Sequence, residues 1–373
     1  MIMGTITEIF RAVGPEYLER FPDLPLDHKK TIRAIINCRA GDFGQVVYQC
    51  AECGQQHAVD RSCGNRHCPQ CQYHKSRQWL DTQLDRRLPG PHFMLTFTMP
   101  EELRPFCRSH QRAAYGAMFK AASRAIKKLA QDPRFIGSDL PGFTAVLHTW
   151  GRQMQYHPHL HLIVPGGGLS PDRKQWLPSG KNFYLPVKGL SKIFRAKFKA
   201  EMVRRELIGG IDPAVWKIDW NVNSQAVGDG EASYKYLAPY IFRVAISDSR
   251  IVGVKDGEVT FSYRKKKSNR PRQTTVDTVE FIRRFLQHVL PTGFMKVRHY
   301  GFMSSSCPVP RSKLRLMVLT VLAALQGDKV CLTDLAPPKD TKAPMPKPKC
   351  RLCGGVLLYL FSLIPGRPCR GST

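Results

Sequence analysis

The stretch GFTAVLHTWGRQMQYHPHLHLIV, residues 142 to 164, decides the fold expected for the middle of the chain. Its two ends, GFTAVLHTW and HLHLIV, are rich in β-branched and aromatic residues, which favours strands, and the polar GRQMQYHP between them is typical of a hairpin connection. Pro158 cannot donate a ladder hydrogen bond, so the second strand is expected to begin after it or to have a local edge there. The stretch therefore predicts an antiparallel strand pair and an α+β pattern.

Three histidines alternate along the second strand, at His157, His159 and His161. Because residues two apart on a strand face the same side, His159 and His161 project together while Leu160 points into the opposite layer. Two adjacent imidazoles make half of a metal site, or they are two hydrogen-bonded structural histidines. His157, at the mouth of the strand, is a candidate third ligand. The glycines at 166–168 form a phosphate cradle or, the favoured interpretation, a turn out of the strand.

The rest of the pattern supports an α+β fold with a central antiparallel sheet and flanking helices. HFMLTFTMP, residues 92–100, alternates like a strand, and the stretch 251–264 predicts a hairpin with Asp256-Gly257 at its turn. Apolar residues at helical spacing predict a helical segment over residues 1–45. Further helices are expected near residues 75–88, 110–129, 190–207, 276–290 and 311–325, with a short helical patch at 234–242.

The composition points to a polyanionic partner. The 373 residues include 57 Lys and Arg against 29 Asp and Glu, a formal charge of +28 that would repel itself unless a polyanion neutralised it. Nucleic acid is the expected partner. The N-terminus lacks the build of a signal peptide, and the best apolar runs, at 316–325 and 354–364, are shorter than the roughly 20 residues of a spanning helix. We therefore expect core elements there, no membrane partner and a cytoplasmic location.

The cysteines are grouped in a way that indicates metal binding. CAECGQQHAVDRSCGNRHCPQC, residues 50–71, holds two CxxC pairs about fifteen residues apart, the spacing of a four-thiolate zinc site. A structural zinc is favoured over a redox pair or disulfides. The predicted ligands are Cys50, Cys53, Cys68 and Cys71, with Cys63, His57, His67 and His74 as further candidates. A catalytic zinc is not expected, because four protein ligands leave no open position for water.

A second pair, Cys350 and Cys353, stands near the C-terminus. It could join Cys331, Cys369 or Cys307 in another zinc site, but a lone CxxC with irregular partners is a weaker signal.

A pair of tyrosines follows in ASYKYLAPYIFRVAIS, residues 232–247. In a helix Tyr236 and Tyr240 would share one face, with Cβ atoms about 5 to 6 Å apart. Alone, such aromatics are usually core residues. Beside the histidines and the positive charge they indicate metal-assisted phosphodiester transfer, in which a metal polarises the phosphate that a phenol attacks. Pro239 is tolerated if the helix starts near Tyr236 and kinks the helix otherwise.

The run RKKKSNRPR, residues 264–272, contains six basic residues in nine. We predict that they contact the DNA backbone, which would make binding strongly salt-dependent, and the alternative is a solvated loop. The residues are Arg264, Lys265, Lys266, Lys267, Arg270 and Arg272.

The order of these segments predicts four consecutive regions. They are a helical segment at 1–45, a zinc-binding domain at 46–88, a catalytic α+β domain at 89–330, and a proline- and lysine-rich tail with a CxxC pair at 331–373.

Four stretches together resemble the rolling-circle insertion-sequence transposases of the HUH two-tyrosine type, which carry an N-terminal zinc-binding domain. The resemblance runs in consistent order from about residue 45 to 325. The stretches are CGNRHCPQCQ (63–72), LHTWGRQMQYHPHLHLIVPGGGLS (147–170), YLAPYIFRVAIS (236–247) and RHYGFMSS (298–305).

The resemblance implies a nuclease domain whose central antiparallel sheet holds Mg²⁺ or Mn²⁺ through His159 and His161. It implies Tyr236 and Tyr240 as nucleophiles that nick single-stranded or hairpin DNA ends, leaving a 5′-phosphotyrosine and a 3′-hydroxyl that host replication can extend. Pro239 departs from the pattern expected of relatives. The alternative is therefore a catalytically inactive, zinc-containing DNA-binding relative.

Overall fold

The computed structural model describes residues 4–241, 246–264, 270–326, 347–365 and 370–371. The chain divides into two compact units, and each is built from segments distant in sequence. The first unit comprises residues 1–74, 242–289 and 339–373, and the second comprises 75–241 and 290–338. Both contain helices and antiparallel sheets, so the predicted α+β class is confirmed.

The second unit is built on a five-stranded, fully antiparallel sheet with the order β13-β5-β6-β3-β9. Its central pair is the predicted hairpin, β5 and β6. The strands are β3 (His92–Thr98), β5 (Phe143–Trp150), β6 (Tyr156–Pro165), β9 (Val222–Ala226) and β13 (Val297–Tyr300).

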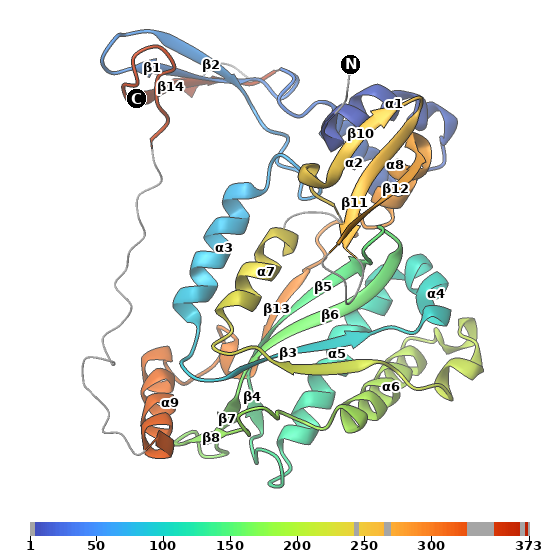
Figure 1. The fold of residues 1–373 in the computed structure, drawn as a ribbon, viewed down its shortest axis with the longest axis vertical. Coiled ribbons are helices and arrows are strands. Elements are labelled where there is room, and N and C mark those ends of the chain that lie inside the picture. The colour runs from blue at the N-terminus through green and yellow to red at the C-terminus, as the bar shows by residue number, and fades with distance from the viewer. Residues whose placement is uncertain (1–3, 242–245, 265–269, 327–346, 366–369, 372–373) are drawn as a thin grey trace. The chain divides into compact units, whose positions relative to one another are not determined.

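One face of this sheet carries the core of the unit. Leu95, Leu160 and Leu162 are completely buried, and they pack with apolar residues of α5 (Gln111–Ala130) and α6 (Val187–Arg204), which lie behind the sheet in Figure 1. Side chains alternate along each strand. The residues that alternate with these leucines along β3 and β6 therefore point to the opposite face of the sheet.

The opposite face is covered by α7 (Glu231–Ile241), which lies in front of the sheet in Figure 1, beside α3 (Tyr73–Arg86). The rings of Trp79 and Tyr234 join the two helices, with centroids 6.2 Å apart. Helix α7 begins five residues before Tyr236, so Pro239 lies in the helix interior and not in its first turn. The short patch predicted from Tyr234 is thus a longer helix.

Strand β6 begins at Tyr156 and includes Pro158, so it does not begin after the proline, and the other expected outcome, a local edge at Pro158, fits the register. The pairing with β5 shifts between His148 and Trp150. Pro158 therefore lies at an interruption of the ladder, where a missing N–H is tolerated.

Two of the three glycines after β6 belong to a short strand of their own. β7 (Gly167–Leu169) pairs with β4 (Leu140–Pro141) and β8 (Trp176–Pro178). A Cβ on Gly168 would lie 2.2 Å from Ser138 Oγ, so close packing requires this glycine. The phosphate cradle is not needed to explain it. Gly166 lies in a bend, so the chain leaves β6 at the glycines as the favoured interpretation expects, and Gly167 and Gly168 then enter a different sheet.

Two further helices belong to the second unit. Helix α9 (Arg311–Gln326) packs on an apolar cluster that includes Trp176 and Phe302. Helix α4 (Arg104–Ser109) precedes α5. Short 3-10 turns in the chain are Glu101–Leu103, Ile208–Gly210, Pro213–Trp216, Asp248–Arg250 and Gly301–Met303.

In the first unit, the predicted N-terminal helices are α1 (Ile6–Arg20) and α2 (Leu26–Ile36). Phe10 of α1 meets Phe285 of α8 (Thr278–Leu286) edge to face, with ring centroids 5.0 Å apart. Helix α8 follows a three-stranded sheet of β10 (Ile251–Lys255), β11 (Glu258–Arg264) and β12 (Pro271–Asp277). The predicted turn between β10 and β11 is confirmed, with positive φ at Asp256 and Gly257, whereas β12 was not expected.

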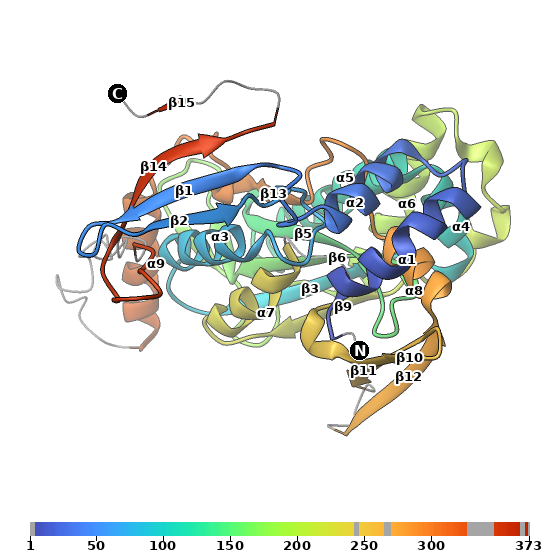
Figure 2. The same ribbon diagram turned by 90° about the horizontal axis from the view of Figure 1, so that it is seen from above.

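A second sheet of the first unit joins the two ends of the chain, in the order β15-β14-β1-β2 (Figure 2). Its strands are β1 (Gln45–Cys50), β2 (Gln56–Asp60), β14 (Leu357–Leu363) and β15 (Arg370–Gly371). The predicted linear regions 1–45, 46–88, 89–330 and 331–373 therefore do not coincide with the compact units. The reason is that residues 242–289 and the C-terminal strands pack with the N-terminal segment.

Gly301 offers a test of the second unit's packing. It has φ +56°, and a Cβ there would lie 1.7 Å from the carbonyl oxygen of Pro141. We expect Gly301→Ala to lower the free energy of unfolding by about 2 to 4 kcal/mol, measured by urea denaturation. Gly293→Ala is the matched control, since Gly293 has φ +74° and open space, and it should cost only about 1 kcal/mol. Equal losses would contradict the packing argument.

Candidate functional site

Three histidines converge on the face of the sheet opposite the core. They are His148 of β5 with His159 and His161 of β6, and each offers a ring nitrogen within 4.8 Å of the others. The register places His148 directly opposite His159, so the two side chains emerge on the same face. The pairing of His159 with His161 follows the prediction, whereas His148 was missed.

Hydrogen bonds fix the orientation of both β6 imidazoles. The Nδ1–H of His159 donates to the carbonyl oxygen of His157 at 2.7 Å, and the Thr96 hydroxyl lies 3.1 Å from Nδ1 of His161. These partners occupy the Nδ1 side of each ring and turn the two Nε2 atoms toward each other, 3.1 Å apart. Such second-layer bonds are typical of histidines that ligate metals.

Burial favours the neutral form of these rings. It lowers the pKa of His161 to about 4 and the pKa of His159 well below its ordinary value. The pKa of His148 is lowered by burial first and then by the neighbouring histidines. Neutral imidazoles keep a lone pair for a cation at physiological pH.

The group fits a divalent cation with open coordination positions. In an octahedral site with bonds of about 2.1 Å, adjacent ligand atoms are about 3 Å apart, close to the separation of the two Nε2 atoms. The group formed by the described residues contains no carboxylate. Nitrogen ligands suit Mn²⁺ better than Mg²⁺, and a phosphate and water would have to supply the oxygen ligands.

His157 does not join this group, so its prediction as the third ligand is corrected. Its Nδ1 accepts a hydrogen bond from the Arg104 guanidinium at 3.0 Å, which holds the ring toward α4. His148 is the third histidine of the group. Its signal in the sequence was the hairpin itself, because an antiparallel partner of β6 must place one residue opposite His159.

The tyrosines of α7 differ sharply in environment. Tyr234 is buried, which raises its pKa to about 12, and the hydroxyl of Thr144 interacts with its phenol. Because Thr144 pairs with Ile163 two positions along from His161, this contact seats α7 on the histidine face. Tyr236 is 55% exposed. Tyr240 lies on the same helix, one turn after Tyr236, and its side chain is outside the described residues.

The first unit holds two cysteine groups instead of the single predicted one. Cys38, Cys63, Cys68 and Cys71 form one group, with Sγ atoms 3.3 Å apart between Cys38 and Cys71. Cys50 and Cys53 belong to the other group. The prediction that Cys50, Cys53, Cys68 and Cys71 share one site is therefore wrong.

The β1–β2 hairpin explains this separation. Cys50 and Cys53 lie at its tip, whereas the residues before β1 and after β2 meet at its base. Five steps of about 3.4 Å along β1 place the tip roughly 17 Å from the base. Cys38, which no CxxC spacing flags, completes the basal group.

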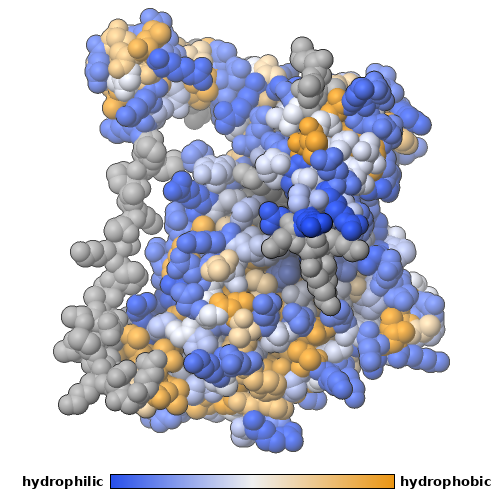
Figure 3. Space-filling model, in the orientation of Figure 1, coloured by the Kyte–Doolittle hydropathy of each residue, from blue (hydrophilic) through white to orange (hydrophobic). Residues whose placement is uncertain are grey.

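Hydrophilic residues cover much of the surface seen in Figure 3. Basic residues gather at two places in the first unit, and the first is the end of the β11–β12 hairpin. Arg264 ends β11, opposite Pro271 of β12, and the side chains of Arg264, Arg270 and Arg272 are exposed. The other predicted contacts, Lys265, Lys266 and Lys267, are outside the described residues.

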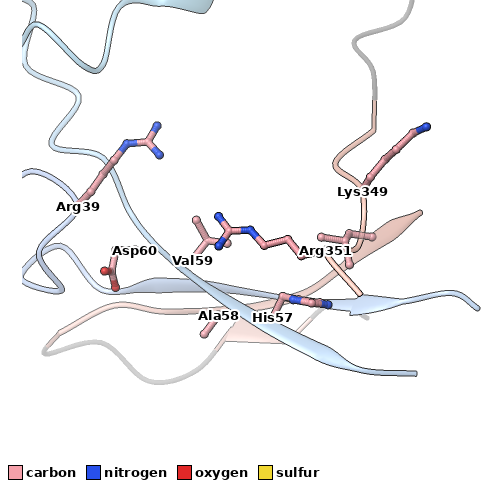
Figure 4. Close-up of a pocket in the computed structure, with 8 residues that line it drawn as sticks. Arg39, His57, Ala58, Val59, Asp60, Lys349 and Arg351 are labelled. Atoms are coloured by element: carbon pink, nitrogen blue, oxygen red, sulfur yellow. The ribbon is translucent and has the colours of Figure 1, made fainter. Parts of the chain in front are cut away.

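The second basic feature is a pocket of about 310 Å³. Figure 4 shows Arg39 and Asp60 on one side, Lys349 on the other, and Arg351 between them. Its residues come from the two ends of the chain, and for this reason the linear sequence gave no sign of it.

None of the helices in the described part of the chain is long and apolar enough to cross a membrane. Two family models match the chain. Residues 9–99 match a transposase zinc-binding domain and residues 142–311 match a putative transposase. No solved structure matches.

Two relatives cover most of the chain. A putative transposase, y4qJ, of Sinorhizobium fredii (strain NBRC 101917 / NGR234) is 36% identical over 327 residues, 80% of each chain. The transposase for insertion sequence element IS801 of Pseudomonas savastanoi pv. phaseolicola is 26% identical over 361 residues, 90% of this chain and 83% of the relative.

The histidine group predicts a specific pattern of cation affinity. We expect His148→Ala and His159→Ala each to weaken Mn²⁺ binding by about tenfold or more, because each removes a ligand. His157→Ala is the control and should change the affinity less than about twofold. Titration followed by the electron paramagnetic resonance of free Mn²⁺ measures all three. If His157→Ala weakened Mn²⁺ binding and His148→Ala did not, His157 and not His148 would be the third ligand, as the sequence predicted.

Proposed function

The chain belongs to the family of insertion-sequence transposases with a zinc-binding domain, and on that premise we propose that it nicks and rejoins single-stranded DNA through tyrosine nucleophiles. The observation that carries the proposal is the three-imidazole group on the sheet face that α7 covers. At the coarser level the protein is a transposase, an enzyme that cuts and transfers DNA. The strand-nicking route refines this statement.

In the proposed reaction, the phenol of Tyr236 or Tyr240 attacks the scissile phosphorus. A divalent ion held by His148, His159 and His161 would polarise the phosphate and offset the developing charge. The phenol gives up its proton as the Tyr O–P bond forms. The P–O3′ bond breaks, and the leaving O3′ takes up a proton to become the free 3′-hydroxyl. Thr96 and the His157 carbonyl keep the imidazoles oriented throughout.

The products are a 5′-phosphotyrosine and a free 3′-hydroxyl that host replication can extend. Because the phosphotyrosine ester conserves the energy of the broken bond, rejoining needs no ATP. A second tyrosine permits a second cleavage while the first end is still covalently held. We expect the substrates to be single-stranded or hairpin element ends and target DNA, and the site of action to be the cytoplasm.

A second candidate function is DNA binding without cleavage. Pro239 in the interior of α7 favours it, since the proline removes one helical hydrogen bond immediately before Tyr240. The two candidates differ in whether a covalent adduct forms.

Covalent capture tests the proposal. The full-length protein is incubated with Mn²⁺ and single-stranded oligonucleotides carrying its element's ends, labelled at the 3′ end so that the tyrosine-linked fragment retains the label. We expect a labelled adduct that survives denaturing gel electrophoresis and is lost in the Tyr236→Phe/Tyr240→Phe double variant. His159→Ala should reduce adduct formation by a factor on the order of 100 or more.

Tyr234→Phe is the matched control, because Tyr234 lies on the same helix but is buried against the sheet. It should retain the adduct. Tight DNA binding by the wild type without any adduct would favour the binding-only function, and an adduct in the double variant would remove both tyrosines from the mechanism.

The basic hairpin end generates a separate prediction. If Arg270 and Arg272 contact phosphates, the Arg270→Ala/Arg272→Ala variant should reduce the slope of log affinity against log salt by about 1 to 2, without changing sequence preference. Lys255→Ala is the control, because Lys255 is exposed on the same sheet next to the opposite turn. Fluorescence anisotropy over a salt series measures the slope. An unchanged slope would leave the run as a solvated loop.

A further inference from the structure

The C-terminal cysteine pair folds into the same turn as a pair near the N-terminus. CAECG (50–54) and CRLCG (350–354) have the same pattern, and both glycines adopt a positive φ, +69° and +77°. In each turn the first cysteine's N–H donates to the residue five positions on, at 2.9 and 2.7 Å. The glycine N–H donates back to that cysteine's carbonyl oxygen, at 3.1 and 3.0 Å.

The two turns face each other and bring four thiols together. Sγ of Cys50 lies 3.4 Å from Sγ of Cys353, and Sγ of Cys53 lies 3.8 Å from Sγ of Cys350. All four sulfurs are within 4.8 Å of one another, and none is in a disulfide. A tetrahedral zinc with Zn–S bonds of 2.3 Å requires sulfurs about 3.8 Å apart. The observed separations therefore fit one four-thiolate site.

Polar partners around the sulfurs strengthen this fit. The N–H of Leu352 donates to Sγ of Cys350 at 3.4 Å, and Nε2 of His57 lies 3.2 Å from the same sulfur. Donors directed at a sulfur stabilise it as a thiolate, the form that binds metal.

Packing alone gives the C-terminal segment little support. Strand β14 pairs with β1, but Leu358 and Tyr359 are each 49% exposed. The buried cluster at this end consists of Cys50, Cys350 and Leu357, with Tyr48 against it. So small a buried core gives the segment little packing energy, which is the situation in which small domains use a structural metal.

We propose that Cys50, Cys53, Cys350 and Cys353 bind a second structural zinc ion, separate from the site at Cys38, Cys63, Cys68 and Cys71. The ion fastens the C-terminal segment to the N-terminal hairpin. Half of its ligands lie outside the matched zinc-binding region, residues 9–99. The C-terminal pair thus finds its partners in Cys50 and Cys53 and not in Cys307, which lies in the second unit. Cys331 and Cys369 are outside the described residues.

The proposed ion would also fix the basic pocket. Lys349 and Arg351 flank Cys350 in the chain, so a metal bound there would fix the backbone that carries both of these pocket cations (Figure 4). This consequence gives the second zinc a role in shaping the surface of the first unit. The inference does not depend on the chemistry of strand transfer.

Zinc content tests the proposal directly. The full-length protein is loaded with Zn²⁺ under reducing conditions, desalted, and analysed by inductively coupled plasma mass spectrometry. We expect the Cys350→Ser/Cys353→Ser variant to hold one zinc ion fewer per chain than the wild type. Cys307→Ser, a cysteine in neither group, is the matched control and should keep the wild-type content. Equal zinc content in the wild type and the double variant would overturn the proposal.

Retention of the C-terminal segment tests its tethering. A protease site is introduced within residues 336–345 of the full chain, and the protein is cut after zinc loading. We expect the fragment that follows the cut to stay with the rest of the chain and to separate when a chelator is added. In the Cys350→Ser/Cys353→Ser variant it should separate without chelator. Separation from the zinc-loaded wild type, or equal retention in the variant, would contradict the tether. The uncut Cys350→Ser/Cys353→Ser variant should still form the covalent DNA adduct. A failure of the tether is therefore distinguishable from a failure of the proposed function.

Discussion

The register between β5 and β6 is the constraint on which the candidate site depends. One choice of pairing places Leu160 and its neighbours in the core and, because side chains alternate, sends His159 and His161 to the other face. The same pairing sets His148 against His159. A slip by one residue would turn the β6 imidazoles into the apolar core and turn the leucines onto the histidine face. Core packing therefore enforces the geometry of the three-histidine group, whose β6 imidazoles are further oriented by Thr96 and one backbone carbonyl.

A comparable logic governs the sheet that contains β1 and β2 in the first unit, where thiols take the place of a large hydrophobic core. The β1–β2 hairpin is too polar to pack by itself, and its length separates the cysteines at its tip from those at its base. Each group must then be completed by sequence from elsewhere: Cys38 at the base, and the C-terminal pair at the tip. The length of the hairpin therefore explains why the chain holds two cysteine groups and why β14 returns to pair with β1.

The local features of the fold could be read from the sequence, and the long-range ones could not. Strand alternation predicted β6 and the shared face of His159 and His161, and the Asp256-Gly257 turn followed from its backbone requirements. His148 needed the register of the hairpin, which a bulge shifts. The pairing of Cys50 with Cys353 spans three hundred residues, and CxxC spacing favours the nearer partner. Such long-range pairings depend on chain topology, which cannot be read from the spacing of residues along the sequence.

Helix α7 shows how these constraints act on the proposed nucleophiles. Burial of Tyr234 fixes the rotation of the helix, and at 100° per residue Tyr236 falls on the side away from that anchor. A phenol sealed beneath the helix could not reach an incoming strand, and its raised pKa would oppose attack. The exposed Tyr236 avoids both obstacles. Pro239 then distinguishes the pair, since Tyr236 lies in the regular helix whereas Tyr240 follows the lost hydrogen bond, one residue before the helix ends. The helix backbone therefore supports the two positions unequally.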